Sequence, residues 1–340
     1  MRAPDFDNLR RILDRQPPRR PTLFEFFLND RLFDRLTGPR DWPNADGLGW
    51  ARRQAAAYAA AGYDFIIVGA SDFRFPYREQ AQEASLSLNE GTLIHDRRSF
   101  EAYPWPDPAK CDCSHLEILP RELPEGMKLI LNAPNGVLEN MMRLVGFESL
   151  CFLLADDPAL AGEIFDAVGS RLLRYYQMGL EFSGVGAIID NDDWGFKTGP
   201  MLSPDQLRRY VFPWHRRIIA AAHAAGKPVI LHSCGNLEGL MDEIIALGID
   251  GKHSYEDNIL PVEAAYERYA GRIAILGGID VDFVCRSCPA AIRQRSEAML
   301  ERSRLRGGYA LGTGNSVPAY VPDDGYLAMT SAAVGPVKLA

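Results

Sequence analysis

The stretch Lys227-Pro-Val-Ile-Leu-His-Ser-Cys-Gly235 says more about this protein than any other part of its sequence. A short apolar run ends in His232 and Cys234, and Gly235 follows. Side chains two residues apart on an extended strand point the same way, so an imidazole and a thiol are offered together. Both are ligands suited to zinc. The alternative for the pair taken alone is a buried histidine beside a small core cysteine.

The same pattern, a short apolar run followed by a helical stretch, recurs along the chain of 340 residues. We expect eight strands, at 22–27, 64–68, 128–133, 186–190, 229–232, 248–253, 273–278 and 309–312. Amphipathic segments such as 207–225 and 237–247 lie between most of them. Eight βα units predict an α/β fold, a single-domain (β/α)8 TIM barrel. An open doubly wound sheet is the competing architecture, disfavoured because no GxGxxG follows the first strands.

A single domain is expected to span residues 1–340, and two regions interrupt its rhythm. Residues 1–20 are basic, and we expect a short helix there that leads into the first strand. Residues 71–126 are too long for one βα connection and show alternating polarity around 91–102. We expect an inserted hairpin between strands two and three that folds over the barrel mouth.

Composition places the chain among soluble globular proteins. It is 47% hydrophobic and 24% charged with a net charge of -8, which argues against nucleic acid or an anionic membrane as the main partner. No run approaches the roughly 18 apolar residues that span a bilayer, and the first residues lack the apolar core of a signal peptide. We therefore expect a cytoplasmic protein. The CxC at 111–113 and the CxxC at 285–288 have no second pair at zinc-ribbon spacing and are interpreted as incidental.

Polar side chains follow seven of the predicted strands, at the end where a barrel gathers its catalytic groups. They are Glu25, Asn132, Asn135, Asp190 to Trp194, His232, Cys234, His253 to Asp257, Asp280 and Thr313 to Ser316. A purely structural end does not need this density of carboxylates, amides, imidazole and thiol. Taken singly, Asp257 and Asp280 are explained equally well as helix caps.

Roles follow from these positions. Catalytic roles are expected for Asp193, Asp192, Asn135 and Glu25, and substrate contacts for Trp194, Tyr255, Asn315 and Asp280. Because Asp192 and Asp193 are adjacent, one carboxylate is expected to face the cavity, with capping of the next helix as the alternative. The aromatic residues are equally compatible with the core. Glu256 lies one βα unit beyond Cys234 and would complete a His232, Cys234 and Glu256 metal shell with an open fourth position.

Four segments carry a resemblance that spans nearly the whole chain: GPMLSPDQLRRYVFPW at 199–214, KPVILHSCGN at 227–236, ILGGID at 275–280 and GTGNS at 312–316. The sequence resembles the uroporphyrinogen decarboxylase superfamily, whose members are single-domain (β/α)8 barrels. One branch, the haem-biosynthetic decarboxylases, has an arginine-rich motif of the kind RQAGRYLPEY that holds the acidic side chains of a tetrapyrrole. Here the corresponding place reads PTLFEFFLND and lacks that arginine.

The cobalamin-dependent methyltransferases, a second branch, resemble this chain more closely. Their zinc is held by the HxC pair, by a cysteine after strand eight and, in some states, by a glutamate after strand six. The HxC pair maps here onto His232 and Cys234, and the glutamate maps onto Glu256. The strand-eight cysteine is absent, since no cysteine follows Cys288. The resemblance implies a zinc cofactor and, because the chain has no DxHxxG motif, a corrinoid on a separate protein. It also suggests a homodimer.

The expected function is methyl transfer in one-carbon and corrinoid metabolism, between a small methylated substrate, either a methyl ether or a thiol, and the corrinoid protein, with zinc as Lewis acid. Loss of the strand-eight sulfur ligand favours a methyl ether over a thiol. Two alternatives stay open. One is metal-free decarboxylation of the uroporphyrinogen decarboxylase type, in tetrapyrrole biosynthesis, which needs a positive cavity. The other is a non-catalytic barrel that binds a small ligand.

Overall fold

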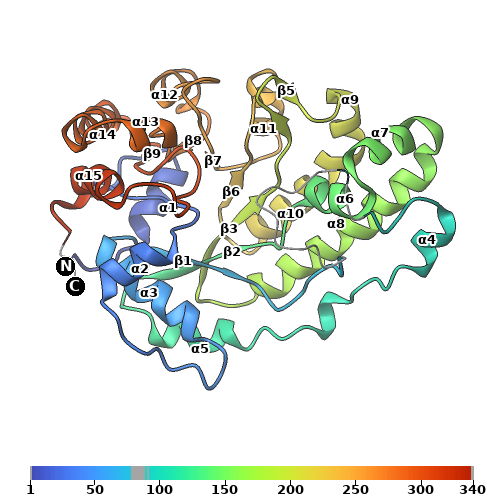
Figure 1. Cartoon of the computed structure of the whole chain (residues 1–340), viewed down its shortest axis with the longest axis horizontal. Coiled ribbons are helices and arrows are strands. Elements are labelled where there is room, and N and C mark those ends of the chain that lie inside the picture. The colour runs from blue at the N-terminus through green and yellow to red at the C-terminus, as the bar shows by residue number, and fades with distance from the viewer. Residues whose placement is uncertain (1, 78–88, 90–91, 338–340) are drawn as a thin grey trace.

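In the part of the chain that the structure describes, seven parallel strands form the central sheet, in the order β1-β2-β3-β6-β7-β8-β9 (Figure 1). They are β1 (Phe65–Gly69), β2 (Lys128–Asn132), β3 (Val185–Asn191), β6 (Val229–His232), β7 (Gly251–His253), β8 (Ala274–Leu276) and β9 (Tyr309–Ala310). This computed structural model describes residues 2–77, 89 and 92–337. The strand order follows the chain and does not reverse at a switch point, as it would in an open doubly wound sheet. The predicted α/β barrel architecture is therefore confirmed.

The first predicted strand, 22–27, takes the eighth position as an extended segment with isolated bridges. Leu23 bridges Leu311, one residue beyond β9, in parallel, and the Phe24 N–H donates to the Leu311 carbonyl at 2.8 Å. On the other side, the Phe24 ring lies 5.5 Å from the ring of Phe65 on β1. The segment thus links the last strand to the first, through backbone hydrogen bonds on one side and side-chain packing on the other.

Helices surround this sheet (Figure 1). They are α1 (Asp7–Leu13), α2 (Asp30–Thr37), α3 (Gly49–Ala61), α4 (Arg97–Ala102), α5 (His115–Glu122), α6 (Val137–Val145), α7 (Phe147–Asp156), α8 (Pro158–Leu180), α9 (Pro204–Gln206), α10 (Phe212–Ala224), α11 (Met241–Ala246), α12 (Val262–Tyr269), α13 (Val281–Arg286), α14 (Pro289–Ser303) and α15 (Asp323–Val334). The described part of the fold also contains two 3-10 helices, η1 (Pro108–Lys110) and η3 (Glu238–Leu240), one π-helix, η2 (Leu207–Val211), and the antiparallel pair β4 (Gly195–Phe196) and β5 (Gly199–Pro200). Of the described helices, none is both long and apolar enough to cross a membrane.

The described part of the insertion between β1 and β2 contains short helices and no strand, so the hairpin predicted there is wrong for these residues. Local capping outweighs the alternating polarity that suggested strands. Asp96 accepts a hydrogen bond from the Ser99 N–H and closes a capping box at the start of α4, and Asp107 caps η1. Residues 78–88 and 90–91, where the rest of the hairpin was expected, lie outside the described residues.

The same part of the insertion runs along α8 (Figure 1). Arg97 pairs with Glu163 of α8, and Arg171 of α8 donates to the Pro106 carbonyl at 2.9 Å. These contacts fasten the segment to the outer helical layer. That it covers the barrel mouth stays a prediction.

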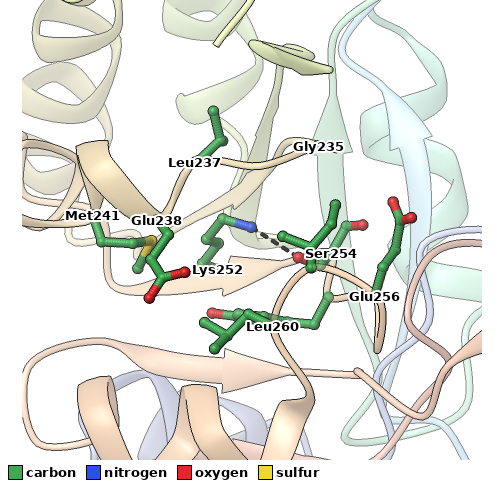
Figure 2. A pocket seen from close by; sticks show the side chains of 10 residues that line it. Gly235, Leu237, Glu238, Met241, Lys252, Ser254, Glu256 and Leu260 are labelled. Atoms are coloured by element: carbon green, nitrogen blue, oxygen red, sulfur yellow. Dashed lines mark hydrogen bonds between the residues drawn. The ribbon is translucent and has the colours of Figure 1, made fainter. Parts of the chain in front are cut away.

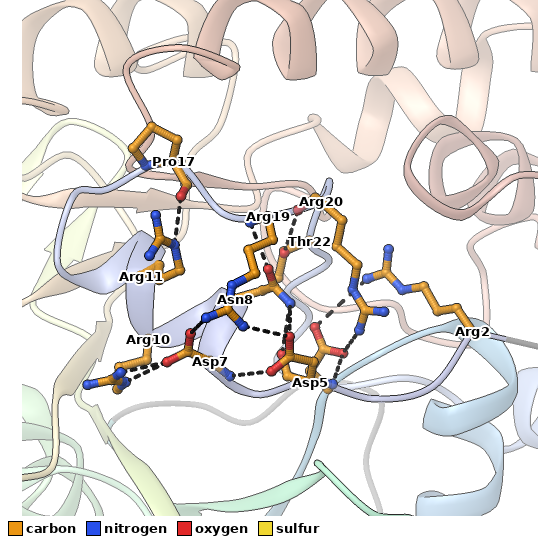
Figure 3. A network of polar contacts seen from close by, with 11 residues as sticks. Arg2, Asp5, Asp7, Asn8, Arg10, Arg11, Pro17, Arg19, Arg20 and Thr22 are labelled. Atoms are coloured by element: carbon orange, nitrogen blue, oxygen red, sulfur yellow. Dashed lines mark hydrogen bonds and ion pairs between the residues drawn. The ribbon is translucent and has the colours of Figure 1, made fainter.

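The predicted N-terminal helix is present as α1, and an ionic network anchors it at the amino end of the sheet (Figure 3). Arg20 donates to Asp64, immediately before β1, at 2.6 Å, and Arg19 pairs with Asp7 at 3.2 Å. Burial raises the pKa of Asp64, and the nearby arginines oppose that shift. These arginines are therefore committed at the end of the sheet opposite the carboxyl ends of the strands.

Candidate metal centre

Three potential ligands meet at the barrel mouth. His232 ends β6 and Cys234 follows it, and Asp193 comes just after β3, the neighbouring strand. One ligand atom of each lies within 4.8 Å of the other two, and Cys234 Sγ is 3.7 Å from His232 Nε2. Asn315, a predicted substrate contact, donates from Nδ2 to Cys234 Sγ at 3.3 Å. An imidazole nitrogen, a thiol and a carboxylate thus converge where barrels carry their chemistry.

Backbone hydrogen bonds join the two loops that supply these ligands. The Asp192 N–H donates to the His232 carbonyl at 3.0 Å, and the Cys234 N–H donates to Asp193 Oδ1 at 2.8 Å. The second bond holds the Asp193 carboxylate beside the thiol. The ligand from β3 is therefore oriented by the same residue that supplies the sulfur.

Gly235 allows the two loops to come this close. Its φ is 84°, a backbone conformation that residues other than glycine rarely adopt. A Cβ at this position would lie 2.1 Å from the carbonyl oxygen of Gly195. The glycine of the His-Ser-Cys-Gly sequence is therefore required by the approach of the β3 loop.

Burial controls the protonation of the three groups. It raises the pKa of the Cys234 thiol to about 12, and the Asp193 carboxylate adds to that shift. Burial also raises the pKa of Asp193. It lowers the pKa of His232 well below the ordinary histidine value, helped by His253 and Lys252. A neutral thiol and a neutral imidazole beside a desolvated carboxylate fit a divalent cation, because the cation would ionise the thiol and offset the burial of the carboxylate.

His253, at the end of β7, lies behind His232. Their Nδ1 atoms are 2.8 Å apart, and His253 Nε2 is 3.3 Å from the Thr313 carbonyl oxygen. The rings of Phe26 and Phe24 pack on His232 and His253 with centroids 4.4 and 5.2 Å apart. Burial lowers the pKa of His253 to about 3. Both imidazoles are therefore neutral and shielded from water.

The two adjacent aspartates face different ways, as the sequence predicted. Asp193 faces the thiol, whereas Asp192 is fully buried away from it. Asp192 accepts hydrogen bonds from the N–H groups of Leu138 and Glu139 at the start of α6, from Trp194 Nε1 and from His215 Nε2, all at 2.8–2.9 Å. Asp192 therefore caps a helix, which was the alternative to catalysis, and Trp194 is a core residue that supports it.

His215 completes this support. Its Nδ1 contacts Asp190 at 2.6 Å and its Nε2 contacts Asp192 at 2.9 Å. Burial disfavours the charged imidazole, but the two carboxylates outweigh it and raise the pKa of His215 to about 10. Asp190 and Asp192 lie on one face of the β3 end, and Asp193 on the other. A buried charged cluster thus holds the loop that presents Asp193.

Glu25, predicted to be catalytic, faces away from the histidines. Side chains alternate along the extended segment, so Phe24 and Phe26 point at the imidazoles and Glu25 points to the opposite side. Its carboxyl group contacts the Thr313 N–H at 3.0 Å and the Thr313 hydroxyl at 2.7 Å. Burial raises the pKa of Glu25 to about 8. Its role in the structure is to hold Thr313.

Asp280 and Asn135 mainly organise loops. Asp280 accepts hydrogen bonds from the N–H groups of Phe283, as the cap of α13, at 3.1 Å and of Asp257 at 2.8 Å, so the helix-cap alternative holds for it. Asn135 has a φ of 67°, and its carbonyl accepts a hydrogen bond from Asn140 at 3.1 Å. Neither residue is part of the metal-ligand group.

Glu256 also lies outside that group. Within the described residues, the carboxylate that joins His232 and Cys234 is that of Asp193. Glu256 lines an adjoining cavity of about 30 Å³ instead (Figure 2). The predicted His232, Cys234 and Glu256 shell is therefore not assembled in this structure.

That cavity contains a buried lysine. Lys252 Nζ donates to the carbonyl groups of Ser254 at 2.8 Å and Ser233 at 3.3 Å and lies 4.6 Å from the centre of the Tyr255 ring. Burial lowers the pKa of Lys252 to about 8. Figure 2 shows the Glu256 carboxylate directed away from the amine. Tyr255, a predicted substrate contact, lines this cavity rather than the metal-ligand group.

Sequence reasoning assigned no role to His253, Lys252 or His215. His253 had a usable signal, since it ends the strand after His232 and the two are paired in the parallel register. Lys252 was visible as a lysine within the predicted strand 248–253. His215 lies on α10 and carried no signal, because its partners come from β3 and the loop beyond it.

A parallel α/β barrel with polar side chains converging at the carboxyl ends of its strands defines the class of this protein. The sequence model described as "Uroporphyrinogen decarboxylase (URO-D)" matches residues 93–334. The chain belongs to this family, whose members are enzymes.

Individual relatives are more distant. The chain is 27% identical to a uroporphyrinogen decarboxylase of Burkholderia cenocepacia over 49% of this chain and 44% of that protein. It is 26% identical to the enzyme of the same name from Thermus thermophilus over 78% of this chain and 77% of that protein. A solved methyltransferase from Methanosarcina mazei has a TM-score of 0.70 with 15% identity and covers 96% of this chain and 97% of its own. That structural similarity shows a shared fold.

Proposed function

We propose that this protein is a methyltransferase that moves a methyl group between a small methylated substrate and a corrinoid held by a separate protein, with zinc at His232, Cys234 and Asp193. The observation that carries the proposal is the convergence of these three ligand atoms within 4.8 Å at the barrel mouth. The methyltransferase from Methanosarcina mazei, which shares the fold, supports it.

The donor set suits a catalytic rather than a structural zinc. Three protein ligands leave one position of a tetrahedral site open. Zinc bound there would supply a Lewis acid that stabilises negative charge on the oxygen or sulfur from which a methyl group departs. A single sulfur ligand leaves more positive charge on the metal than two would, which favours methyl ethers as substrates.

The residues of this chain would prepare the site in three ways. Asn315 donates a hydrogen bond to the sulfur, which stabilises a thiolate. The Cys234 N–H holds Asp193 in place. The rings of Phe24 and Phe26 keep water from the histidines, which strengthens the electrostatic interactions within the site.

Metal content tests this proposal directly. Protein purified without chelator is expected to contain close to one equivalent of zinc, and His232→Ala and Cys234→Ala are expected to lose it. The matched pair Asp193→Asn and Glu256→Gln identifies the third ligand, since only the first is expected to lower zinc content. Less than about 0.1 equivalent in the parent protein would rule out the zinc site.

Turnover is tested with free cob(I)alamin and a panel of methyl ethers and methyl thioethers. Methylation of the corrinoid is followed by its absorbance, and His232→Ala is expected to abolish it. No methylation with any member of the panel by zinc-loaded protein would count against methyl transfer.

Decarboxylation is the second candidate, and the names of the two curated relatives favour it. A substrate with many carboxylates needs several cationic partners. Arg19 and Arg20 are committed to aspartates at the far end of the sheet (Figure 3). The buried Lys252 amine is already engaged by the carbonyl groups of Ser254 and Ser233. We therefore place decarboxylation below methyl transfer. Formation of coproporphyrinogen from uroporphyrinogen by the purified protein would reverse this order.

A further inference from the structure

We propose that His253 is a positioning residue that fixes His232 in its Nδ1–H tautomer, so that the Nε2 lone pair of His232 faces Cys234 and the metal position. The inference rests on the proposed function for the identity of the metal, but the tautomer itself is a property of the metal-free protein. It explains the contact between the buried imidazoles of His232 and His253, and it explains why Glu25 holds Thr313, whose carbonyl contacts His253.

Counting donors and acceptors assigns each proton. The Thr313 carbonyl can only accept, so the 3.3 Å contact with His253 Nε2 requires the proton on that nitrogen. His253 is fully buried and neither of its two ring contacts is a carboxylate, so the ring is neutral and its Nδ1 is bare. The proton in the 2.8 Å contact between the two Nδ1 atoms must belong to His232. His232 Nε2 is left with a lone pair, 3.7 Å from Cys234 Sγ.

Thr313, which begins the series of hydrogen bonds from Thr313 through His253 to His232, is held rigidly. Thr313 is held through its N–H and hydroxyl by the buried Glu25, and its carbonyl also accepts the Gly278 N–H at 2.8 Å. Gly277 has a φ of 69°, and a Cβ there would lie 2.2 Å from the Thr313 oxygen and 3.0 Å from His253 Nε2. The backbone is therefore shaped to let this carbonyl reach the imidazole.

Aromatic packing holds the two imidazole rings in place. Phe24 lies edge-on to His253, and Phe26 lies 4.4 Å from His232 at an interplanar angle of 34°. Turning the His253 ring would displace Phe24, which is buried in the core, and turning the His232 ring would displace Phe26, which packs against the core. The hydrogen bond made by one ring nitrogen decides which nitrogen is left for a metal. Loss of such an outer partner typically weakens metal binding about 10- to 100-fold.

Nitrogen NMR of histidine-labelled, metal-free protein tests the assignment. The chain has six histidines, and the His232→Ala and His253→Asn spectra identify the two signals. We expect His232 protonated at Nδ1 and bare at Nε2, and His253 protonated at Nε2 and bare at Nδ1. The reverse pattern in either ring would overturn the proposal.

Two variants separate positioning from packing. His253→Phe keeps a ring beside Phe24 but has no acceptor, so we expect His232 to lose its Nδ1–H preference and Co²⁺ affinity to fall about 10- to 100-fold. His253→Asn places an amide oxygen near the position of Nδ1 and is expected to restore the tautomer and most of the affinity. His223→Asn, on an exposed histidine of α10, is the control.

The outcomes distinguish this proposal from the proposed function. Thermal unfolding of each variant identifies one that fails to fold, and the spectrum of the parent protein decides the tautomer without any variant. Equal Co²⁺ affinity of parent and folded His253→Phe would refute the positioning role. The expected tautomers in a protein that takes up no zinc would uphold the hydrogen-bond chain while the methyltransferase proposal fails.

Discussion

Replacing Glu25 with glutamine is expected to stabilise this protein at neutral and alkaline pH. Burial raises the pKa of Glu25 from 4.5 to about 8, so the carboxyl group is mostly protonated at neutral pH. The Thr313 hydroxyl lies 2.7 Å from one carboxyl oxygen and 3.2 Å from the Asn315 carbonyl oxygen; once Glu25 is protonated, its O–H can donate to this hydroxyl while the hydroxyl donates to the Asn315 carbonyl. The Thr313 N–H donates to the other oxygen. A glutamine amide reproduces this pattern without a group that can ionise.

The magnitude follows from linkage between proton binding and folding. The pKa of Glu25 is higher in the folded than in the unfolded protein. The stability that its protonated carboxyl group contributes is therefore complete below pH 4.5 and is lost as the pH rises through about 8. At about 1.4 kcal/mol per pH unit, the loss over this interval is on the order of 4–5 kcal/mol, of which about 3 kcal/mol has occurred by pH 7. A typical domain is stable by only about 5–15 kcal/mol.

Urea unfolding followed by circular dichroism measures the effect at about pH 5, 7 and 8.5. Glu25→Gln and the parent are expected to be similar near pH 5, and the variant is expected to be more stable by a margin that grows with pH. Thr313→Val, which keeps the shape but removes the hydroxyl, is expected to lose about 1–2 kcal/mol at every pH. Parallel pH profiles for the parent and Glu25→Gln would refute the assignment of a buried, protonated Glu25.

Three further predictions concern the candidate site. The raised pKa of His215 between Asp190 and Asp192 means that its stabilisation is present below pH 6.5 and is lost as the pH rises through about 10; His215→Phe should flatten that alkaline loss and cost about 3–5 kcal/mol at pH 7, measured by urea unfolding. Cys234 in metal-free protein should react with iodoacetamide far more slowly than an exposed cysteine at pH 8, because its pKa is about 12; fast labelling, located by peptide mass spectrometry, would contradict the buried neutral thiol. Gly235→Ala should lower the free energy of unfolding by about 2 kcal/mol or more and lower zinc content, since the φ of Gly235 is 84° and a Cβ would lie 2.1 Å from the Gly195 carbonyl oxygen. An unchanged melting temperature with full zinc occupancy would show that the segment after β3 moves to accommodate the methyl group.

The strands could be predicted because each is a local pattern. Short, mostly apolar runs at 128–133, 229–232 and 309–312 are followed by turn residues and helices, and each overlaps a strand. The segment 22–27 has the same pattern but forms only isolated bridges. Whether it pairs along its length depends on its neighbours in the barrel, which local sequence does not specify.

The insertion shows the opposite case. Alternating polarity at 91–102 resembled a strand, yet Asp96 and Ser99 cap a helix there. A side chain that hydrogen-bonds its own backbone competes directly with strand pairing. The capping residues were present in the sequence and were the better signal.

The sequence alone determined the parallel α/β architecture and the pairing of His232 with Cys234, because both depend on residues close together in the chain. It also limited Asp192 and Asp193 to opposite orientations. Only the tertiary structure decided that Asp193, rather than Glu256, joins the pair, that Glu25 points away from the histidines, and that His253 backs His232. These contacts depend on strand register and on how closely loops approach one another, which arise from packing over the whole barrel rather than from local preference.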